Sequence, residues 1–178
     1  ATGKNLVVWD NTSDKGISAY KLYRERIINV YDSIARINAS NLSIFRDMVA
    51  DAESQAFRYK ITIIDSCGTE SLLENSKYHE PIYLQYVSAE GGINLEWTNY
   101  QIEGSDIGTY LTSFIIYRGT DSTGLQEYIT LGSTNKYTDK DPDALVRKYY
   151  YRVAGVLKDP CSPTGSSGKK VDSGPYSQ

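Results

Sequence analysis

The chain has 178 residues and a formal net charge of −3, and neither half carries the basic stripe that a nucleic-acid partner requires. No apolar run approaches the ~18 residues that cross a bilayer as a helix, so we expect no membrane-spanning segment. A chain of this length forms one domain or two.

The first part of the chain predicts short strands separated by polar turns. We expect strands at residues 5–9, 17–26, 27–38, 41–47, 57–64 and 72–75. Residues 27–38 also fit one face of a helix, because their apolar residues recur at intervals of three and four. Their counterpart in the second half, residues 127–131, is too short for a helix and lies between Gly124 and Gly132, which favours a strand.

The second part continues the pattern after a short junction at residues 77–81, which ends in Pro81 and should be stiff. We expect strands at residues 82–87, 92–100, 111–118, 127–131, 136–138 and 148–156. The strand at 82–87 has no counterpart in the first half. Gly155 interrupts the last strand, which indicates a bulge or close packing at that position.

Five blocks of the first half recur in the same order in the second half. The matches pair residues 7–9 with 94–97 at Trp9 and Trp97, residues 20–24 with 114–118, residues 31–34 with 128–131, residues 44–47 with 136–139, and the strand from Phe57 with the strand from Tyr149. Repetition in a fixed order indicates two homologous domains, which we place at residues 1–78 and 79–178. Each is long enough for a single sandwich core, and the first is expected to lack the strand that opens the second.

A tryptophan comes early in each repeat, a tyrosine-bearing strand comes late, and there are about seven short strands per ~90 residues. This pattern resembles fibronectin type III modules and implies an all-β fold of two tandem immunoglobulin-like β-sandwiches. The phrases at 64–71, 117–120 and 174–177 are similar to modules in long secreted or surface proteins of Bacteroidetes. Such proteins often carry gliding-motility or type IX secretion sorting domains. The resemblance implies an extracellular or cell-surface location, with neighbouring domains of the same polypeptide as partners.

The resemblance also implies a non-catalytic pair of modules that acts as a spacer or interaction platform within a larger protein. A nucleophilic triad needs a histidine to move the proton, and His79 lies in the junction, far in sequence from Cys67 and Cys161. We therefore expect no enzyme activity and no cofactor, and a packing role for His79. The two cysteines occupy equivalent positions in separate domains, so we expect no disulfide between them.

Two groups of side chains are candidates for ligand binding. Tyr100, Tyr110 and Tyr176 lie outside the repeated blocks and could expose rings to a carbohydrate or a protein, which is the alternative to a spacer function. The other tyrosines fall mostly on strands, where their rings stabilise sheets.

The second group is the run of alternating carboxylates Asp139, Asp141 and Asp143, whose oxygens suit calcium. The run lacks the glycine and the distal glutamate of an EF-hand loop, so the favoured interpretation is a solvated acidic turn with no metal. Arg24 and Arg118 end equivalent strands, and we expect cation–π contacts or ion pairs from them rather than ligand binding.

Overall fold

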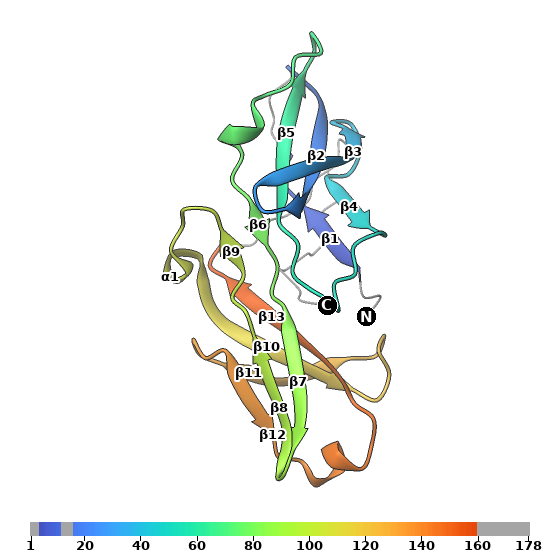
Figure 1. The fold of residues 1–178 in the computed structure, drawn as a ribbon, viewed down its shortest axis with the longest axis vertical. Coiled ribbons are helices and arrows are strands. Elements are labelled where there is room, and N and C mark those ends of the chain that lie inside the picture. Colours follow the sequence, from blue (N-terminus) through green and yellow to red (C-terminus); the bar gives the residue numbers. More distant parts are fainter. Residues whose placement is uncertain (1–3, 12–15, 160–178) are drawn as a thin grey trace.

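The computed structural model describes residues 4–11 and 16–159, and strands dominate its regular elements (Figure 1). The first part of the chain contains β1 (Asn5–Val8), β2 (Ile17–Ile27), β3 (Val30–Asn38), β4 (Ile44–Asp47), β5 (Tyr59–Asp65), the 3-10 helix η1 (Leu73–Asn75) and β6 (His79–Glu80). The second part contains β7 (Leu84–Ala89), β8 (Gly92–Trp97), β9 (Gln101–Ile102), α1 (Ile107–Tyr110), β10 (Leu111–Gly119), β11 (Gln126–Leu131), β12 (Lys136–Asp139), the 3-10 helix η2 (Pro142–Leu145) and β13 (Tyr150–Leu157).

The described strands pair into antiparallel sheets, which confirms the predicted all-β fold class. In the order of hydrogen-bonded neighbours the sheets are β1–β4, β12–β8–β7, β11–β10–β13 and β3–β2–β5–β6–β9. Figure 1 shows β2, β3 and β5 above β6, β1 and β4 beside it, and the strands from β7 onward below or beside it. The last sheet therefore runs from the upper strands through β6 to β9.

Apolar side chains gather in two hydrophobic clusters that share no residue. The smaller cluster has Trp9, Tyr20 and Leu22 at its centre. The larger cluster is centred on Ile82, Ile93, Leu95, Trp97, Phe114, Ile116, Ala144 and Val153. Both tryptophans are buried, and each ring packs against an aromatic neighbour of its own cluster.

The two halves of the chain place corresponding strands in the same register. The corresponding pairs of opposite residues are Asn5–Asp47 and Ile93–Asp139, Leu22–Ile61 and Ile116–Val153, and Arg24–Tyr59 and Arg118–Tyr151. A register shift also occurs at the same place in both, just before Tyr23 in β2 and just before Tyr117 in β10. Four of the five sequence matches therefore coincide with matching strand geometry.

The fifth match, of residues 31–34 with 128–131, is wrong by three positions. Ala35 lies opposite Leu22 of β2, and Ile129 lies opposite Ile116, the residue of β10 that corresponds to Leu22. Ala35 therefore corresponds to Ile129, so the residue that corresponds to Tyr128 is Ile34 and not Tyr31. The error arises because β2 and β3 form a long hairpin that turns at Asn29, where φ is 61°, whereas residues 120–125 form a wider connection in the second half.

Three further predictions about elements can be compared with the structure. The segment at 27–38 contains strand β3, so its helical interpretation is wrong. The predicted strand at 72–75 is also wrong, because Leu73–Asn75 forms a 3-10 helix and only Glu70 makes a bridge to β5. Among the described residues β1 pairs with β4 alone, whereas β8 pairs with both β12 and β7. This agrees with the prediction that the first half lacks a counterpart of β7.

Gly155 illustrates why a strand can require glycine. A Cβ atom at this position would lie 2.8 Å from Leu111 Cδ2 and 3.4 Å from Ile82 Cδ1. The predicted close packing is therefore present in the second core, where any larger side chain would displace these two residues.

Candidate functional site

The most buried charged group among the described residues is Asp139, the last residue of β12, which is 0 % exposed. Arg118 at the end of β10 donates from Nη1 to Asp139 Oδ2 at 2.7 Å and from Nη2 to Asp141 at 2.8 Å. Tyr151 donates to Oδ2 at 2.8 Å, while Tyr128 and the Asp141 amide donate to Oδ1 at 3.1 and 3.0 Å. We call these five residues the Arg118 centre.

The strand order explains why these side chains meet. β12 lies in one sheet, while β10, β11 and β13 lie in the other, so inward-pointing residues of the two sheets face each other. The guanidinium of Arg118 also lies 3.9 Å from the ring centroid of Tyr128 and 4.5 Å from that of Tyr149. Arg118 thus makes both the ion pair and the cation–π contacts expected from the sequence.

The protonation of the Arg118 centre follows from these bonds. Burial alone would raise the pKa of Asp139, but the hydrogen bonds from Arg118, the Asp141 amide, Tyr151 and Tyr128 outweigh it and hold the pKa below its ordinary value. Burial and the neighbouring carboxylate raise the pKa of Tyr151. Asp139 is therefore an anion and Tyr151 a neutral donor at neutral pH, which suits a structural ion pair and not an acid–base catalyst.

A smaller version of this centre lies in the first half. Arg24 Nη1 donates to Asp47 Oδ2 at 2.8 Å, and Tyr59 donates to the same oxygen at 3.0 Å. The Arg24 guanidinium lies 5.5 Å from the ring centroid of Phe57. Asn5 donates to the hydroxyl of Tyr59 at 2.9 Å, where the second half has Ile93. The repetition shows that the centre belongs to the scaffold that both halves share.

The candidate calcium ligands lie in and beside the Arg118 centre. Both oxygens of Asp139 accept hydrogen bonds from protein groups, so the turn is not solvated at this residue, contrary to the favoured interpretation. Asp141 caps η2 by accepting from the amide of Asp143, and Pro142 opens that turn. Asp143 pairs with Arg147 at 3.5 Å. In residues 4–11 and 16–159 no group of three His, Cys, Asp or Glu side chains is arranged to hold a metal ion.

The candidate tyrosines fall into two groups. Tyr100 and Tyr110 are half-buried and lie edge to face with ring centroids 6.2 Å apart, while Tyr176 lies outside the described residues. Tyr110 donates to the carbonyl of Tyr100 at 2.9 Å, and the Tyr100 hydroxyl meets Nδ1 of His79 at 2.5 Å. The structure therefore brings Tyr100, Tyr110 and His79 into one aromatic cluster beside the junction, and it agrees with a packing role for His79.

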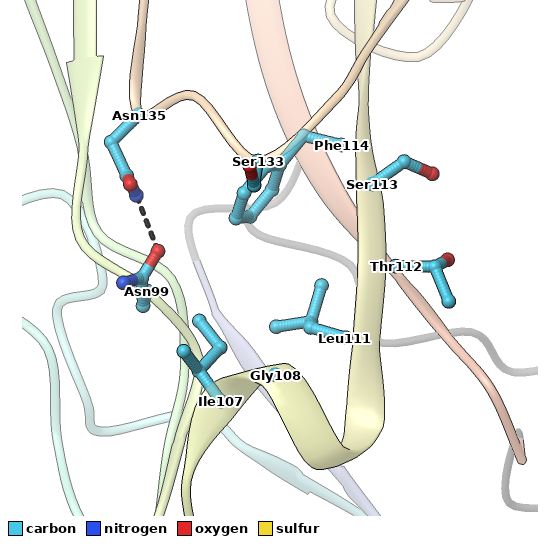
Figure 2. A pocket seen from close by; sticks show the side chains of 9 residues that line it. All are labelled: Asn99, Ile107, Gly108, Leu111, Thr112, Ser113, Phe114, Ser133 and Asn135. Atoms are coloured by element: carbon cyan, nitrogen blue, oxygen red, sulfur yellow. Dashed lines mark hydrogen bonds between the residues drawn. The ribbon is translucent and has the colours of Figure 1, made fainter.

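A small pocket of about 90 Å³ lies beside α1 and β10 (Figure 2). It is lined by Asn99, Ile107, Gly108, Leu111, Thr112, Ser113, Phe114, Ser133 and Asn135. Figure 2 shows the amide of Asn135 bonded to Asn99 at one side and apolar side chains from α1 and β10 at the other. Binding pockets for small molecules usually measure about 300–1,000 Å³, so this pocket has room for one small chemical group only.

Sequence reasoning missed two cation–ring contacts in and beside β10 and β13. Arg152 lies with its guanidinium carbon 4.6 Å from the ring centroid of Tyr117, and Lys148 with Nζ 4.8 Å from that of Tyr150. It also missed Tyr86, the most exposed tyrosine of the described residues at 70 %. Alternation along the strand was the available signal for one of these contacts, because it places Tyr150 and Arg152 on one face.

At the junction, residues of the two halves of the chain contact each other through strand pairing and ion pairs. His79 of β6 lies opposite Tyr59 of β5 and also opposite Ile102 of β9. Arg58 pairs with Glu80 at 2.7 Å, and Lys60 pairs with Glu103 at 3.0 Å. These pairs were invisible to sequence reasoning because their partners are 22 and 43 residues apart with no periodic relation.

Four further contacts stabilise the junction. Glu103 accepts a hydrogen bond from the Tyr78 amide at 3.0 Å and donates its own amide to the Tyr78 carbonyl at the same distance. Arg58 stacks on the ring of Tyr78, and Tyr83 donates to the Glu53 carbonyl at 3.2 Å. The junction is thus held by backbone pairing, ion pairs and ring contacts together.

Cys67 is a free, exposed thiol, and Cys161 lies outside the described residues. No helix in the described part of the chain is long and apolar enough to cross a membrane. A comparison with protein-family models gives no match, and no curated protein matches the chain. The functional argument therefore depends on the geometry of the chain itself.

Proposed function

We propose that the chain is a non-catalytic pair of fibronectin type III-like modules, residues 1–78 and 79–178, that serves as a stiff spacer in a larger secreted or cell-surface protein. The single observation that carries this proposal is the sheet β3–β2–β5–β6–β9, which runs without interruption from the first module into the second. A spacer needs a fixed angle between its modules, and backbone pairing across a junction provides one.

The shared register supports the division into two modules of one kind. Each half has its own hydrophobic cluster, its own arginine–aspartate–tyrosine centre and the same register shift before its Tyr-Arg pair. Two unrelated domains would not reproduce both a buried ion pair and a bulge at equivalent positions.

The state of the titratable groups supports a scaffold rather than an enzyme. A catalytic carboxylate needs a pKa near the working pH, and Asp139 and Asp47 instead have lowered pKa values within hydrogen-bonded ion pairs. For Asp47, burial works in the opposite direction and is outweighed by the amides of Ala50 and Val49, Arg24 and Tyr59. Both carboxylates instead accept hydrogen bonds that hold neighbouring strands together.

Rotational diffusion of the two modules, measured by NMR relaxation of backbone amides, tests the proposal. We expect one common correlation time for residues 16–78 and 81–157. The junction variant Glu80→Gln/Glu103→Gln should separate the two values, because it weakens the partners of Arg58 and Lys60. The matched control Glu74→Gln/Glu90→Gln removes the same charge at exposed positions and should leave them equal. Independent tumbling of the unmodified chain would exclude a stiff spacer.

A second candidate function is ligand binding by exposed side chains, with a polysaccharide or a protein as partner. The observations that favour it are the exposed ring of Tyr86 and the contact of exposed Lys148 with the ring of Tyr150. This function is compatible with a spacer, because none of these residues belongs to the junction strands β6 and β9.

A further inference from the structure

The pocket beside α1 and β10 is built by a connection that is longer in the second half of the chain than in the first. The buried tryptophan of each half is joined to the next long strand by residues 10–16 in the first half and by residues 98–110 in the second. The longer connection forms β9 and α1, and it supplies Asn99, Ile107 and Gly108 to the pocket lining. The first half pairs its corresponding strands without such a segment, so the pocket is not required by the fold that the two halves share.

Two side-chain amides form one side of this pocket (Figure 2). Asn135 donates from Nδ2 to Oδ1 of Asn99, and it donates from the same nitrogen to the carbonyl oxygen of Trp97 at 3.2 Å. These bonds fix both amides, and Asn99 Oδ1 keeps a second lone pair for a further donor. The carbonyl of Asn135 accepts from the Trp97 amide as that of Ser43 accepts from the Trp9 amide. Ser43 therefore stands at the position of Asn135, and the amide pair is not repeated in the first half.

Apolar side chains form the other side of the pocket. Ile107 of α1 and Leu111 and Phe114 of β10 lie across the pocket from the amide pair in Figure 2. Phe114 is 3 % exposed and packs edge to face on Trp97, and β10 is hydrogen-bonded to β11 on one side and to β13 on the other. This apolar wall is therefore held in place before a ligand arrives, and a ligand group that covers it removes apolar surface from water.

The volume and the lining restrict the chemistry of the group that can enter. A volume of about 90 Å³ admits a group of a few non-hydrogen atoms, because one water molecule takes up about 30 Å³ of the liquid. None of the nine described residues that line the pocket is charged, so a carboxylate or an ammonium group would lose its water without gaining a counter-ion. An acetamido group satisfies both conditions. Its methyl group would cover the apolar wall, its N–H would donate to Asn99 Oδ1, and its carbonyl oxygen would accept from the exposed hydroxyl of Ser133.

We infer that this pocket binds the acetamido group of an N-acetylated sugar. In such a sugar the amide nitrogen is bonded directly to the ring, so the ring hydroxyl groups lie at the mouth of the pocket. The lining residues other than the amides and the apolar wall are Gly108, Thr112, Ser113 and Ser133, which offer hydroxyl groups to a sugar. An acetylated lysine would instead bring a long alkyl chain, for which these residues provide no apolar groove. The inference goes beyond the spacer function and does not depend on a stiff junction.

An NMR titration of the isotope-labelled chain tests the inference. The probes are the trimer of N-acetylglucosamine, N-acetylgalactosamine, Nε-acetyl-lysine, and cellotriose, which has hydroxyl groups in place of the acetamido groups. We expect at least one N-acetylated sugar to shift the side-chain amide signals of Asn99 and Asn135 and the backbone amide signal of Gly108 in a saturable way. The absence of such shifts with both N-acetylated sugars, or equal shifts with cellotriose, would overturn the inference. An equal or tighter response to Nε-acetyl-lysine would also overturn it, and would identify an acetylated peptide as the partner.

Variants locate the site. Gly108→Leu adds a side chain at the pocket, and the fold should tolerate it, because a Cβ atom there would lie 3.6 Å from its nearest neighbour, Asp106 Oδ1. We expect this variant to raise the dissociation constant at least about tenfold. The control Gly124→Leu, whose Cβ atom would lie 3.9 Å from its nearest neighbour outside the pocket, should bind like the unmodified chain. Ser133→Ala removes one hydrogen bond and should weaken binding about fivefold.

The outcomes of these variants are decisive in either direction. Should Gly108→Leu prevent folding, Ser133→Ala decides, because Ser133 is exposed and its replacement leaves the core unchanged. Unchanged affinity in a folded pocket variant would refute the assignment, and so would an equal loss in Gly124→Leu. The two halves should keep their common correlation time in every variant, so a failure of this site is distinguishable from a failure of the spacer.

Discussion

Replacement of Arg118 by Met isolates the energy of the buried ion pair in the second half. The variant keeps an unbranched apolar side chain but leaves Asp139, which is fully buried, without its cation. Removing one partner of a buried pair costs about 3–5 kcal/mol, because the remaining charge has been taken out of water without compensation. Loss of the stacking on Tyr128 and Tyr149 adds to this cost.

The equivalent variant in the first half, Arg24→Met, is the reference with which the loss of stability in Arg118→Met is compared. Arg24 is more exposed than Arg118 (21 % against 15 %), makes its ion pair with Asp47 alone, and lies 5.5 Å from a single ring. We therefore expect Arg118→Met to lower the free energy of unfolding of its own half by about 1–2 kcal/mol more than Arg24→Met lowers that of the first half.

The assay is urea unfolding followed by tryptophan fluorescence, since each half contains one tryptophan. Trp97 reports on the second half in a Trp9→Phe background, and Trp9 on the first half in a Trp97→Phe background. The lowered pKa of Asp139 means that its pair contributes fully above the ordinary pKa and is lost as the pH falls through the folded value. In Arg118→Met the unpaired carboxyl takes up a proton more readily, so the cost of the substitution should shrink between pH 7 and pH 4.

Two controls make this reasoning refutable. Asp139→Asn in the Arg118→Met background removes the unpaired charge and should recover part of the lost stability, which a double-mutant cycle measures as coupling. If Arg118→Met lowers the free energy of unfolding by less than about 1 kcal/mol, or by an amount that does not change with pH, the pair contributes no more than a solvent-exposed salt bridge and the reasoning from burial is refuted.

Two other stability predictions follow from particular contacts. Gly92→Ala should cost at least about 3 kcal/mol, because φ is 151° and a Cβ atom would meet the carbonyl oxygen of Asp139; Gly132→Ala, which meets open space, is the control in thermal unfolding. Glu70, whose pKa the hydrogen bond from Tyr23 lowers to about 2, should contribute stability that is present above pH 4.5 and is lost as the pH falls toward 2. Because Glu70 is 29 % exposed, we discount the shift to about 1–2 kcal/mol. Glu70→Gln should flatten the dependence of the urea midpoint on pH in this range, and an unchanged acid limb would contradict the assignment.

Much of the fold could be predicted because strand signals are local. Alternation and turn residues located most of the strands, and the repeat decided that residues 27–38 form a strand, where periodicity alone allowed a helix. Repetition also placed Arg24 and Arg118 at matching strand ends, where both make ion pairs. The sequence match of Tyr31 with Tyr128 was wrong, because the two hairpins differ in length. Aligning residues of the same type there pairs residues that do not occupy the same position in the two hairpins.

The candidate sites were harder to predict because they depend on distances between sheets. Asp139 looked like one acid of a polar turn, and only its place opposite Arg118, Tyr128 and Tyr151 makes it a buried anion. Tyr100 and Tyr110 were chosen for lying outside the repeat, yet they pack on each other, because the short helix α1, which ends at Tyr110, brings the two rings together. Tyr86 becomes exposed because β7 is the edge strand of its sheet.

The comparison of the two halves separates cations that pair with a buried carboxylate inside the fold from cations on the outer face of the sheets. Arg24 and Arg118 face inward and pair with a buried carboxylate in both halves, so their role follows the fold. Lys60 and Arg152 face outward at equivalent positions, but their printed contacts differ. Lys60 pairs with Glu103 at the junction, whereas the guanidinium of Arg152 lies against the ring of Tyr117. The same strand position therefore makes an ion pair in the first half of the chain and a cation–π contact in the second half.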